Sequence, residues 1–540
     1  MKNFVNARET LVQESIDGLL LSSGGRLTRL DGFPQIKVVL RSELNRERVA
    51  LISGGGSGHE PAHAGFVGSG MLSAAVCGEV FASPSVEAVL TAIRAVTGEA
   101  GCLLIVKNYT GDRLNFGLAA ERARHMGLKV EMVVVGDDVS IPSSANPRGV
   151  AGTLFVQKVA GFFAERGDTL EAVKQAASHA ADSVKTMGLA LTTCHPPGSA
   201  GKEALGDDEA ELGLGIHGEP GVRKVPVGSA RELLDLVVGG LEAEVGEGPL
   251  CVLLNNLGAV PPVEMTLLLK DFAETSLGRR TELVVGPAPL MTSYDMNGFS
   301  LTAMPLTDEL REAMVAEVGS PFWPKATNFA KAPLVAPPET EFTPAPASDD
   351  AVVGARLSAL LQALVESRDD LNALDAKVGD GDAGDTFANA AAAITQKFSE
   401  LPLAEPDSLL AALSASLGHA GGSSGILLAI FTGAASSEYH QRQDWLSALD
   451  YGLERMRFYG GASPGDRTML DALIPGLQAL KNGDSFAQAA AKAREGANAT
   501  AGMSRASAGR SSYLNADTLQ GVVDPGAEAV ARAFEALARS

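Results

Sequence analysis

The sequence predicts two parts of different fold class on one chain of 540 residues, a two-lobed α/β part followed by an all-helical part. Three observations support this prediction. Short β-branched segments alternate with helical patterns up to about residue 330. A segment with five prolines follows, at 331–350. Beyond it, strand patterns disappear, and alanine and leucine recur at helical spacing.

The first part, residues 1–330, is expected to form two α/β lobes that divide between residues 185 and 200. Strand–helix–strand order favours a parallel sheet with helices on its faces. In the first lobe we expect strands at 48–53, 103–109 and 129–136, and helices at 85–97, 113–126, 154–166 and 170–187. In the second lobe we expect helices at 230–241 and 261–275, and strands at 250–255, 281–286 and 301–306.

The segment 331–350 is expected to be a linker, because its prolines exclude regular structure and favour an extended spacer. Residues 351–540 are expected to form the all-helical domain, since Val353, Leu357 and Leu360 already show the spacing of a buried helix face. A cluster of aspartates is expected at the end of the first helix. We expect about eight helices, starting near residues 350, 385, 406, 423, 443, 466, 484 and 525.

Composition excludes several classes of partner. The chain has 44 basic and 65 acidic residues and a net charge of −21, which argues against nucleic acid and anionic membranes as partners. Its longest apolar run, around 426–432, is too short to span a bilayer. The four cysteines show no CxxC spacing, and the first residues show no signal-peptide pattern. We therefore expect a cytoplasmic protein with reduced cysteines.

Asp375, Asp380, Asp382 and Asp385 lie in the stretch LDAKVGDGDAGDTF at 374–387. Carboxylates this close repel one another unless a cation neutralises them. An EF-hand calcium loop does not fit, because glycine and alanine stand where two of its ligands belong. A Mg²⁺ ion shared with substrate phosphates fits better. The alternative is a solvated acidic turn with Asp385 as a helix N-cap.

Two polar motifs follow expected strands of the first lobe. GGGSGHEP at 54–61 contains His59, a possible acid or base, and KNYTGD at 107–112 ends in Asp112. Because parallel strands end at one edge of a sheet, His59 and Asp112 are expected to lie near each other. The alternatives are a surface histidine and an aspartate that caps the following helix.

A third motif, GLGIHGEPG at 213–221, contains the spacing of a dinucleotide-binding fingerprint. An acidic stretch at 207–211 precedes it where a strand should be, so we reject that interpretation. His217 lies among glycines on an expected loop, where it can approach a small ligand as a base or nucleophile. Taken alone, an exposed loop histidine is the better interpretation.

The helical part contains four further motifs: GGSSG at 421–425, GGASPGDRTMLDAL at 460–473, GRSSYL at 509–514 and DPG at 524–526. GGSSG precedes an apolar helix, whose N-terminal N–H groups and two serines suit an anion. Arg467 and Arg510 are possible contacts to a phosphoryl group. Each motif alone also fits an ordinary cap or loop.

In this order, the motifs resemble the dihydroxyacetone (glycerone) kinase family over nearly the whole chain, in its single-chain ATP-dependent form. The first part is similar to the dihydroxyacetone-binding domain and the second to the ATP-binding domain, which in the family is a barrel of eight helices. The resemblance implies that Mg²⁺ is the cofactor and that ATP and a short ketose are the ligands. It also implies a homodimer formed through the substrate domain.

The resemblance further implies that His217 adds to the ketone carbon and holds the substrate as a hemiaminal. His59 and Asp112 would hydrogen-bond the reacting hydroxyl and take its proton. The other implied substrate residues are Gly56, Ser57, Gly58 and Lys107, and the implied Mg²⁺ ligands are Asp375, Asp380 and Asp382. The implied ATP contacts are Ala383, Gly384, Asp385, Thr386, Ser423, Ser424, Gly460, Met469, Arg510, Asp524, Pro525 and Gly526. Arg467 and Ala383 depart from the residues common in the family, so no side-chain contact is assigned to either.

Phosphorylation of dihydroxyacetone to dihydroxyacetone phosphate is therefore the leading hypothesis, with D-glyceraldehyde and erythrulose as open alternatives. A second hypothesis is cyclisation of FAD to cyclic FMN with release of AMP. A third is a regulatory protein that senses a ligand through the same fold. The sequence leaves open whether transfer occurs within one chain or across a dimer.

Overall fold

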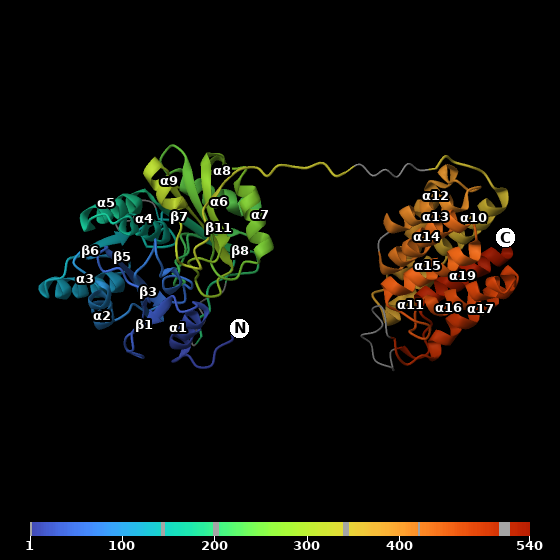
Figure 1. Ribbon diagram of the computed structural model, residues 1–540, viewed down its shortest axis with the longest axis horizontal. Coiled ribbons are helices and arrows are strands. Elements are labelled where there is room, and N and C mark those ends of the chain that lie inside the picture. Colours follow the sequence, from blue (N-terminus) through green and yellow to red (C-terminus); the bar gives the residue numbers. More distant parts are fainter. Residues whose placement is uncertain (1–2, 142–145, 198–204, 339–344, 420–421, 507–518) are drawn as a thin grey trace. The chain divides into compact units, whose positions relative to one another are not determined.

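The computed structural model describes residues 3–141, 146–197, 205–338, 345–419, 422–506 and 519–540. These residues form two compact units, Met1–Leu334 and Val335–Ser540, which are described separately (Figure 1). The first unit is mixed α/β and the second is helical, as the sequence predicts. No described helix is both long enough and apolar enough to cross a membrane.

The first sheet of the α/β unit places its parallel strands side by side in the order β4, β3, β5, β6. Strands β1 and β2 extend it in antiparallel pairing. Alternate residues of the central strands face two separate cores, because successive side chains of a strand point to opposite faces of the sheet. The strands are β1 (Leu27–Arg29), β2 (Val38–Arg41), β3 (Ala50–Ser57), β4 (Ala74–Val80), β5 (Cys102–Lys107) and β6 (Val130–Val135).

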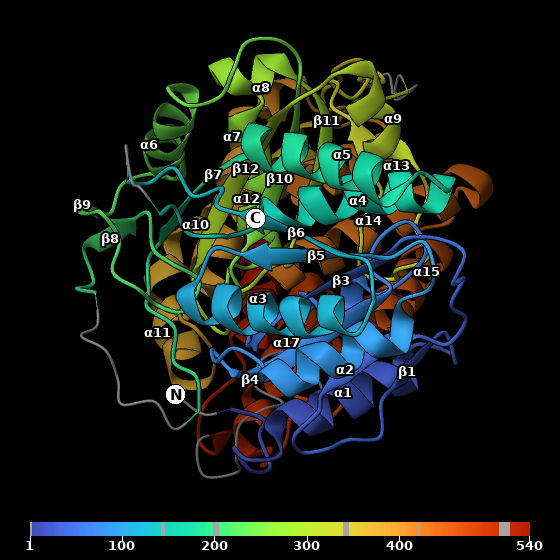
Figure 2. The same ribbon diagram turned by 90° about the vertical axis from the view of Figure 1, so that its left-hand side faces the viewer.

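Helices cover both faces of this sheet. Figure 2 shows α2 and α3 on one side of β5 and β6, with α4 and α5 on the other. Phe116 of α3 packs into one core and Phe155 of α4 into the other, and neither is exposed. The helices are α1 (Leu11–Ser22), α2 (Val86–Val96), α3 (Thr110–His125), α4 (Thr153–Arg166) and α5 (Leu170–Ser183).

The second sheet has the strand order β13-β11-β10-β12-β7-β8-β9. It is mixed, because β10 pairs in parallel with β11 and antiparallel with β12. The strands are β7 (Lys185–Ala190), β8 (Glu209–Leu212), β9 (Arg223–Pro226), β10 (Leu250–Asn256), β11 (Thr281–Ala288), β12 (Gly298–Pro305) and β13 (Thr327–Asn328). Its helices are α6 (Ala230–Glu242), α7 (Pro262–Phe272), α8 (Ser276–Arg280) and α9 (Asp308–Val315).

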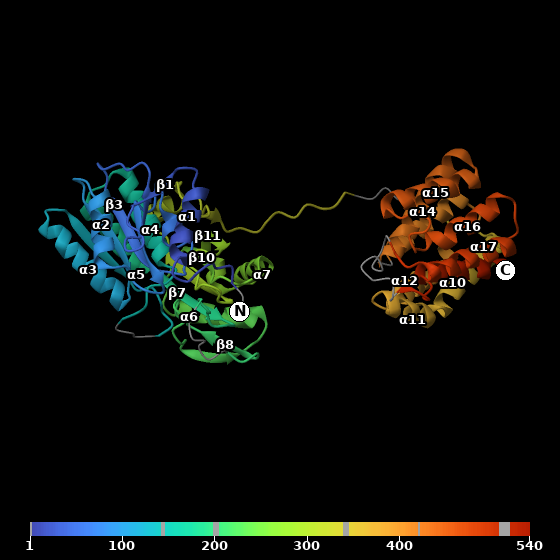
Figure 3. The same ribbon diagram turned by 90° about the horizontal axis from the view of Figure 1, so that it is seen from below.

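The expectation that no strand precedes the third glycine-rich motif is wrong, because β8 occupies Glu209–Leu212. Its neighbour β9 ends the sheet, and β8 lies at the margin of the unit in Figure 3. Charged residues are tolerated here because Ala210 and Leu212 face the core, while Glu209 pairs with Lys224 at 2.9 Å. The chain then turns into β9 rather than into a helix, so the helix that a dinucleotide fingerprint needs does not follow.

Nine α-helices are described in the second unit, and the expected first helix is divided in two. The break lies at Ser367, whose hydroxyl donates to the Ala363 carbonyl at 2.7 Å and accepts from Arg532 at 3.1 Å. The aspartate cluster therefore follows the second helix, not the first. The helices are α10 (Ala351–Glu366), α11 (Arg368–Val378), α12 (Ala383–Gln396), α13 (Pro406–His419), α14 (Gly422–Arg442), α15 (Trp445–Gly460), α16 (Leu470–Lys481), α17 (Phe486–Ala499) and α19 (Pro525–Arg539).

Candidate active site

The α/β unit brings His59 and His217 together, although 158 residues separate them in the sequence. The Nε2 atoms of the two rings lie 3.1 Å apart. His59 follows β3, is fully buried, and places its Nδ1 atom 2.8 Å from the Thr292 carbonyl oxygen. His217 is partly buried, and its ring lies edge-on to Tyr109 with 4.5 Å between the ring centroids. The alternatives of a surface histidine and an exposed loop histidine therefore do not hold.

A buried lysine and aspartate lie beside this pair. Lys107 ends β5, and Asp112 lies in the first turn of α3 rather than at its N-cap, which is Tyr109. Within the described structure, Lys107 Nζ and Asp112 Oδ1 have no hydrogen-bond partner. Gly55 permits their approach, because a Cβ there would meet Lys107 Nζ at 3.0 Å and Asp112 Oδ2 at 3.3 Å. Unsatisfied buried polar atoms are costly, so these two suit the hydroxyl groups of a bound ligand.

The remaining predicted substrate residues lie at the end of β3, which contains Gly56 and Ser57, and directly after it, where Gly58 follows. A Cβ at Gly56 would meet the backbone of Ala82 at 2.7 Å, and the Ser57 hydroxyl donates to the Gly78 carbonyl at 2.8 Å. The Gly58 N–H donates to the Glu60 carboxylate at 2.9 Å. The backbone at the end of β3 therefore packs directly against β4 and the loop that follows it.

Burial controls the charges at this site. It lowers the pKa of His59 well below its usual value, and the nearby positive charge of Lys107 lowers it further. Burial also lowers the pKa of Lys107, although the carboxylate of Asp112 opposes the shift. His59 is therefore neutral at physiological pH, as a base that takes a hydroxyl proton must be.

Two side chains at this site carried no separate prediction from the sequence. Glu219 lies two residues after His217 and contacts its ring, with Oε1 3.0 Å from Nδ1. Phe81 stacks on His59 with 5.3 Å between centroids. Glu219 lies in the same GLGIHGEPG motif as His217, so the sequence alone could have suggested that the two side chains interact. Nothing in the sequence around Phe81 marks it.

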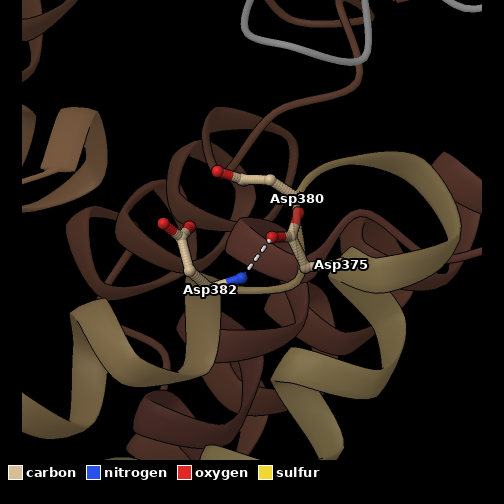
Figure 4. A group of neighbouring side chains, drawn as sticks. All are labelled: Asp375, Asp380 and Asp382. Carbon is tan, nitrogen blue, oxygen red and sulfur yellow. Dashed lines mark hydrogen bonds between the residues drawn. The ribbon is translucent and has the colours of Figure 1, made fainter. Parts of the chain in front are cut away.

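In the helical unit, Asp375 in the last turn of α11 comes together with Asp380 and Asp382, which follow in the loop before α12 (Figure 4). One carboxylate oxygen from each lies within 4.8 Å of the others. Asp375 is buried and its Oδ2 accepts N–H groups of the loop, from Gly381 at 2.9 Å and from Asp382 at 3.0 Å. Three hard oxygen donors that face one point fit a Mg²⁺ ion.

These aspartates line a pocket of about 840 Å³. One part of the lining is polar, with the carboxylates and the first turn of α14, and another part is apolar. The predicted residues that line the pocket are Asp375, Asp380, Asp382, Ala383, Thr386, Ser423, Ser424, Gly460, Met469, Asp524, Pro525 and Gly526. Such a pocket has room and chemistry for a nucleotide with its phosphates at the polar part.

Two predicted ATP contacts, Gly384 and Asp385, make contacts between helices. Gly384 packs α12 against α11, since a Cβ there would meet the Arg368 carbonyl oxygen at 2.0 Å. Asp385 pairs with Arg368 at 2.5 Å and is not the N-cap of α12, which is Asp382. Neither residue lines the pocket. Arg510 lies outside the described residues.

Asp524 leads to a prediction about pH. Burial raises the pKa of its carboxyl to about 6, whereas an unfolded aspartate ionises near pH 4. The folded state therefore binds this proton more tightly, and stability falls as pH rises from about 4 to about 6. The carboxylate caps α19 by accepting the Ala527 N–H at 2.8 Å, and asparagine caps as well as aspartate. We expect Asp524→Asn to raise the free energy of unfolding of the ligand-free protein by up to about 3 kcal/mol above pH 6.

Thermal denaturation between pH 4 and 8 measures this effect, and the difference from the wild type should shrink as the pH falls. Asp444→Asn is the matched control, because Asp444 also caps a helix, α15, but is exposed. The hydrogen bond from Ser447 lowers the pKa of Asp444, so its replacement should not stabilise the protein at any pH. A gain at Asp524 that is independent of pH would contradict the prediction.

Comparison with known families identifies the class of protein. Residues 18–322 match the Dak1 domain and residues 377–539 match the DAK2 domain. Each match falls within one of the two units, so the chain combines both domain types. The chain belongs to the dihydroxyacetone kinase family, in the form that carries both domains on one polypeptide.

Characterised relatives span the whole chain. A dihydroxyacetone kinase from Citrobacter freundii is 48% identical over 99% of this chain and 99% of its own. The triokinase/FMN cyclase of Homo sapiens is 40% identical over 99% of this chain and 98% of its own. The crystal structure of the C. freundii kinase in complex with AMP-PNP and Mg²⁺ is similar with a TM-score of 0.86, 45% identity and coverage of 100% and 99%.

Proposed function

We propose that this protein transfers the γ-phosphoryl group of ATP to a hydroxyl of dihydroxyacetone, forming dihydroxyacetone phosphate. The observation that carries the proposal is the pairing of His217 with His59, beside the unsatisfied polar atoms of Lys107 and Asp112. That arrangement offers a nucleophilic nitrogen to a carbonyl carbon and polar partners to hydroxyls. The 48% identity to a dihydroxyacetone kinase over the whole chain supports it.

In the α/β unit, His217 Nε2 adds to the ketone carbon and holds the substrate as a hemiaminal. Lys107 and Asp112 then satisfy hydroxyl groups of the bound sugar. His59, neutral because of its burial, takes the proton of the hydroxyl that receives the phosphoryl group, and Asp112 supports this step. Gly56 and Ser57, which end β3, and Gly58, which precedes His59, border the site.

In the helical unit, Asp375, Asp380 and Asp382 would hold Mg²⁺, which neutralises charge on the nucleotide phosphates. Ser423 and Ser424 present hydroxyls and helix N–H groups to those phosphates. The apolar lining around Met469 and Gly460 receives the base, and Pro525 and Gly526 border the pocket. Arg510 remains a prediction for charge stabilisation.

Consumption of ATP by the purified protein with Mg²⁺ tests the proposal. We expect rapid turnover with dihydroxyacetone and background turnover with glycerol, because glycerol has no carbonyl for His217. Phosphorylated product is identified by ³¹P NMR. Equal turnover with both compounds, or none with the ketone, would refute a carbonyl-selecting kinase.

A second activity is favoured by the human relative, whose name includes FMN cyclase. Cyclisation of FAD with release of AMP would use the nucleotide pocket and its metal and would not need His217. Incubation with FAD and Mn²⁺, followed by chromatography for AMP, tests it. Absence of AMP under conditions that support ketone phosphorylation would exclude this activity.

We further propose that the protein is a cytoplasmic homodimer joined through the α/β unit, as the family resemblance implies. Analytical ultracentrifugation tests the dimer. Relatives named for L-erythrulose and for 3,4-dihydroxy-2-butanone keep other short ketoses open as substrates. Comparison of kcat/KM for dihydroxyacetone, erythrulose and D-glyceraldehyde decides among them.

A further inference from the structure

We propose that Glu219 is a positioning residue for His217, which keeps a proton on Nδ1 so that Nε2 is the ring nitrogen that reacts with the ketone. This inference rests on the proposed function and deepens it, since it assigns a role to a carboxylate that the substrate itself does not need to touch. The same carboxylate is the counter-ion for the positive ring that forms when His217 bonds to carbon.

The contact between Glu219 and His217 is made at two points. Glu219 Oε1 lies 3.0 Å from Nδ1 of the ring, and Oε2 accepts the backbone N–H of His217 at 2.9 Å. Gly218, with φ +68°, allows the chain to turn back between them. A Cβ at Gly215 would lie 2.0 Å from Glu219 Oε2, so a glycine is needed for the carboxylate to fit. The glycines of this motif thus make room for a carboxylate that orients the ring.

The rest of the loop is held by other residues. Arg148 donates to the Gly213 carbonyl at 2.7 Å, and Ser293 donates to the Ile216 carbonyl at 2.7 Å. Glu211 accepts the Gly221 N–H at 2.7 Å. These contacts hold the backbone of the loop from β8 and from two connecting segments, those before α4 and before β12. Glu219 adds the contact to the ring itself, which separates its role from general support of the loop.

The hydrogen bonds around His59 and His217 require one proton more than two neutral imidazole rings carry. The Thr292 carbonyl only accepts, so His59 Nδ1 carries a hydrogen. An ionised Glu219 only accepts, so His217 Nδ1 carries one as well. The two Nε2 atoms then face each other at 3.1 Å, and one of them must donate. The resting pair therefore holds one proton more than two neutral rings, balanced by the charge of Glu219.

The surroundings of His59 disfavour this proton on His59. Burial, the charge of Lys107 and the charge of His217 all lower the pKa of His59, so His59 is the neutral acceptor. Burial alone would raise the pKa of Glu219, but the hydrogen bond and charge of His217 lower it to about 2. Tyr109 faces the ring edge-on, and burial raises its pKa well above the usual value, so its hydroxyl stays protonated.

The covalent step then balances in protons and charge. The Nε2 proton of His217 passes to His59, and the freed lone pair forms the bond to the ketone carbon. The π electrons of the carbonyl move to oxygen, which takes the proton from His59. The product is a hemiaminal hydroxyl, a neutral His59 that can act as base, and an imidazolium on His217 whose Nδ1–H still faces the carboxylate of Glu219.

The test compares Glu219→Gln with Glu211→Gln as the matched control. Both variants change a carboxylate near the motif at 213–221 to an amide, but the hydrogen bond described for Glu211, which lies in β8, is to the backbone N–H of Gly221. We expect Glu219→Gln to lower kcat/KM for dihydroxyacetone by at least about 100-fold, as loss of an imidazole-orienting carboxylate does elsewhere. KM for ATP should be unchanged, and Glu211→Gln should stay within about threefold of the wild type. Equal losses in both variants would overturn the proposal.

A spectroscopic readout separates protonation from loop structure. The chain has eight histidines, so [¹⁵N]histidine labelling and NMR resolve the ring nitrogens, and His217→Ala identifies the signals of His217. We expect both ring nitrogens of His217 to be protonated in the wild-type protein at neutral pH, and Nε2 to lose its proton in Glu219→Gln. Unchanged nitrogen shifts in the variant would overturn the proposal. If wild-type protein shows no ketone-dependent turnover, the proposed function fails, and the shifts still report separately on Glu219.

Discussion

Replacement of His217 with alanine is expected to lower kcat/KM for dihydroxyacetone by about 10³-fold or more, equivalent to about 4 kcal/mol of transition-state stabilisation. The variant loses the nitrogen that we propose adds to the ketone, and His59 loses the ring that its Nε2 atom faces at 3.1 Å. Nucleotide binding should be unaffected, because its pocket is built from residues of the helical unit. Steady-state kinetics with dihydroxyacetone, together with calorimetric titration of Mg²⁺-AMP-PNP, measures both effects.

The control for this experiment is His179→Ala, which removes an exposed histidine of α5 and should leave the kinetics unchanged. His217 also contacts the rings of Tyr109 and Phe81, so His217→Asn serves as a second variant that keeps a polar side chain. Both His217 variants should retain near-wild-type melting temperatures. Ketone turnover that survives in a folded variant would contradict the assignment of His217 as the nucleophile.

The largest expected effect in the helical unit comes from Asp380→Asn combined with Asp382→Asn. Both carboxylates are exposed, whereas Asp375 is buried and braces the loop by accepting its N–H groups. The double variant therefore removes two of the proposed Mg²⁺ ligands and leaves the hydrogen bonds between Asp375 and the loop in place. We expect kcat/KM for ATP to fall by about 10³-fold and the half-saturating Mg²⁺ concentration to rise steeply. The Mg²⁺ dependence of the initial rate measures both quantities.

Metal removal offers an independent check on the same residues. Saturation with Mg²⁺ at about 100 times its dissociation constant should stabilise the wild-type protein by roughly 2.7 kcal/mol, and the double variant should show little of this effect. In EDTA the variant should be at least as stable as the wild type, because fewer like charges face one another. Asp369→Asn, an exposed aspartate in the first turn of α11, is the control. Equal stabilisation of all three proteins by Mg²⁺ would show that the metal binds elsewhere.

Several elements were predictable because their signals are local. Helix α2 and strands β5 and β6 fall within one or two residues of the expected ranges, since apolar periodicity and capping residues mark them. The break at Ser367 was not predictable, because the apolar spacing continues through it and the contact with Arg532 comes from the last helix. Strand β8 was missed for a related reason. Its acidic residues obscure the pattern, and its pairing with β7 and β9 near the edge of the sheet is decided by the tertiary structure.

The sequence by itself determined which chemistry is present. It supplied two histidines among glycines, a lysine and an aspartate at strand ends, a run of close carboxylates, and the composition that divides the chain into α/β and helical parts. Only the tertiary structure decided how these groups pair. It set His217 against His59, placed Glu219 against the ring of His217, and placed Gly384 and Asp385 in contact with Arg368 of α11. The physical reason is that residue types are encoded locally, whereas hydrogen-bond partners and burial depend on elements far apart in the chain.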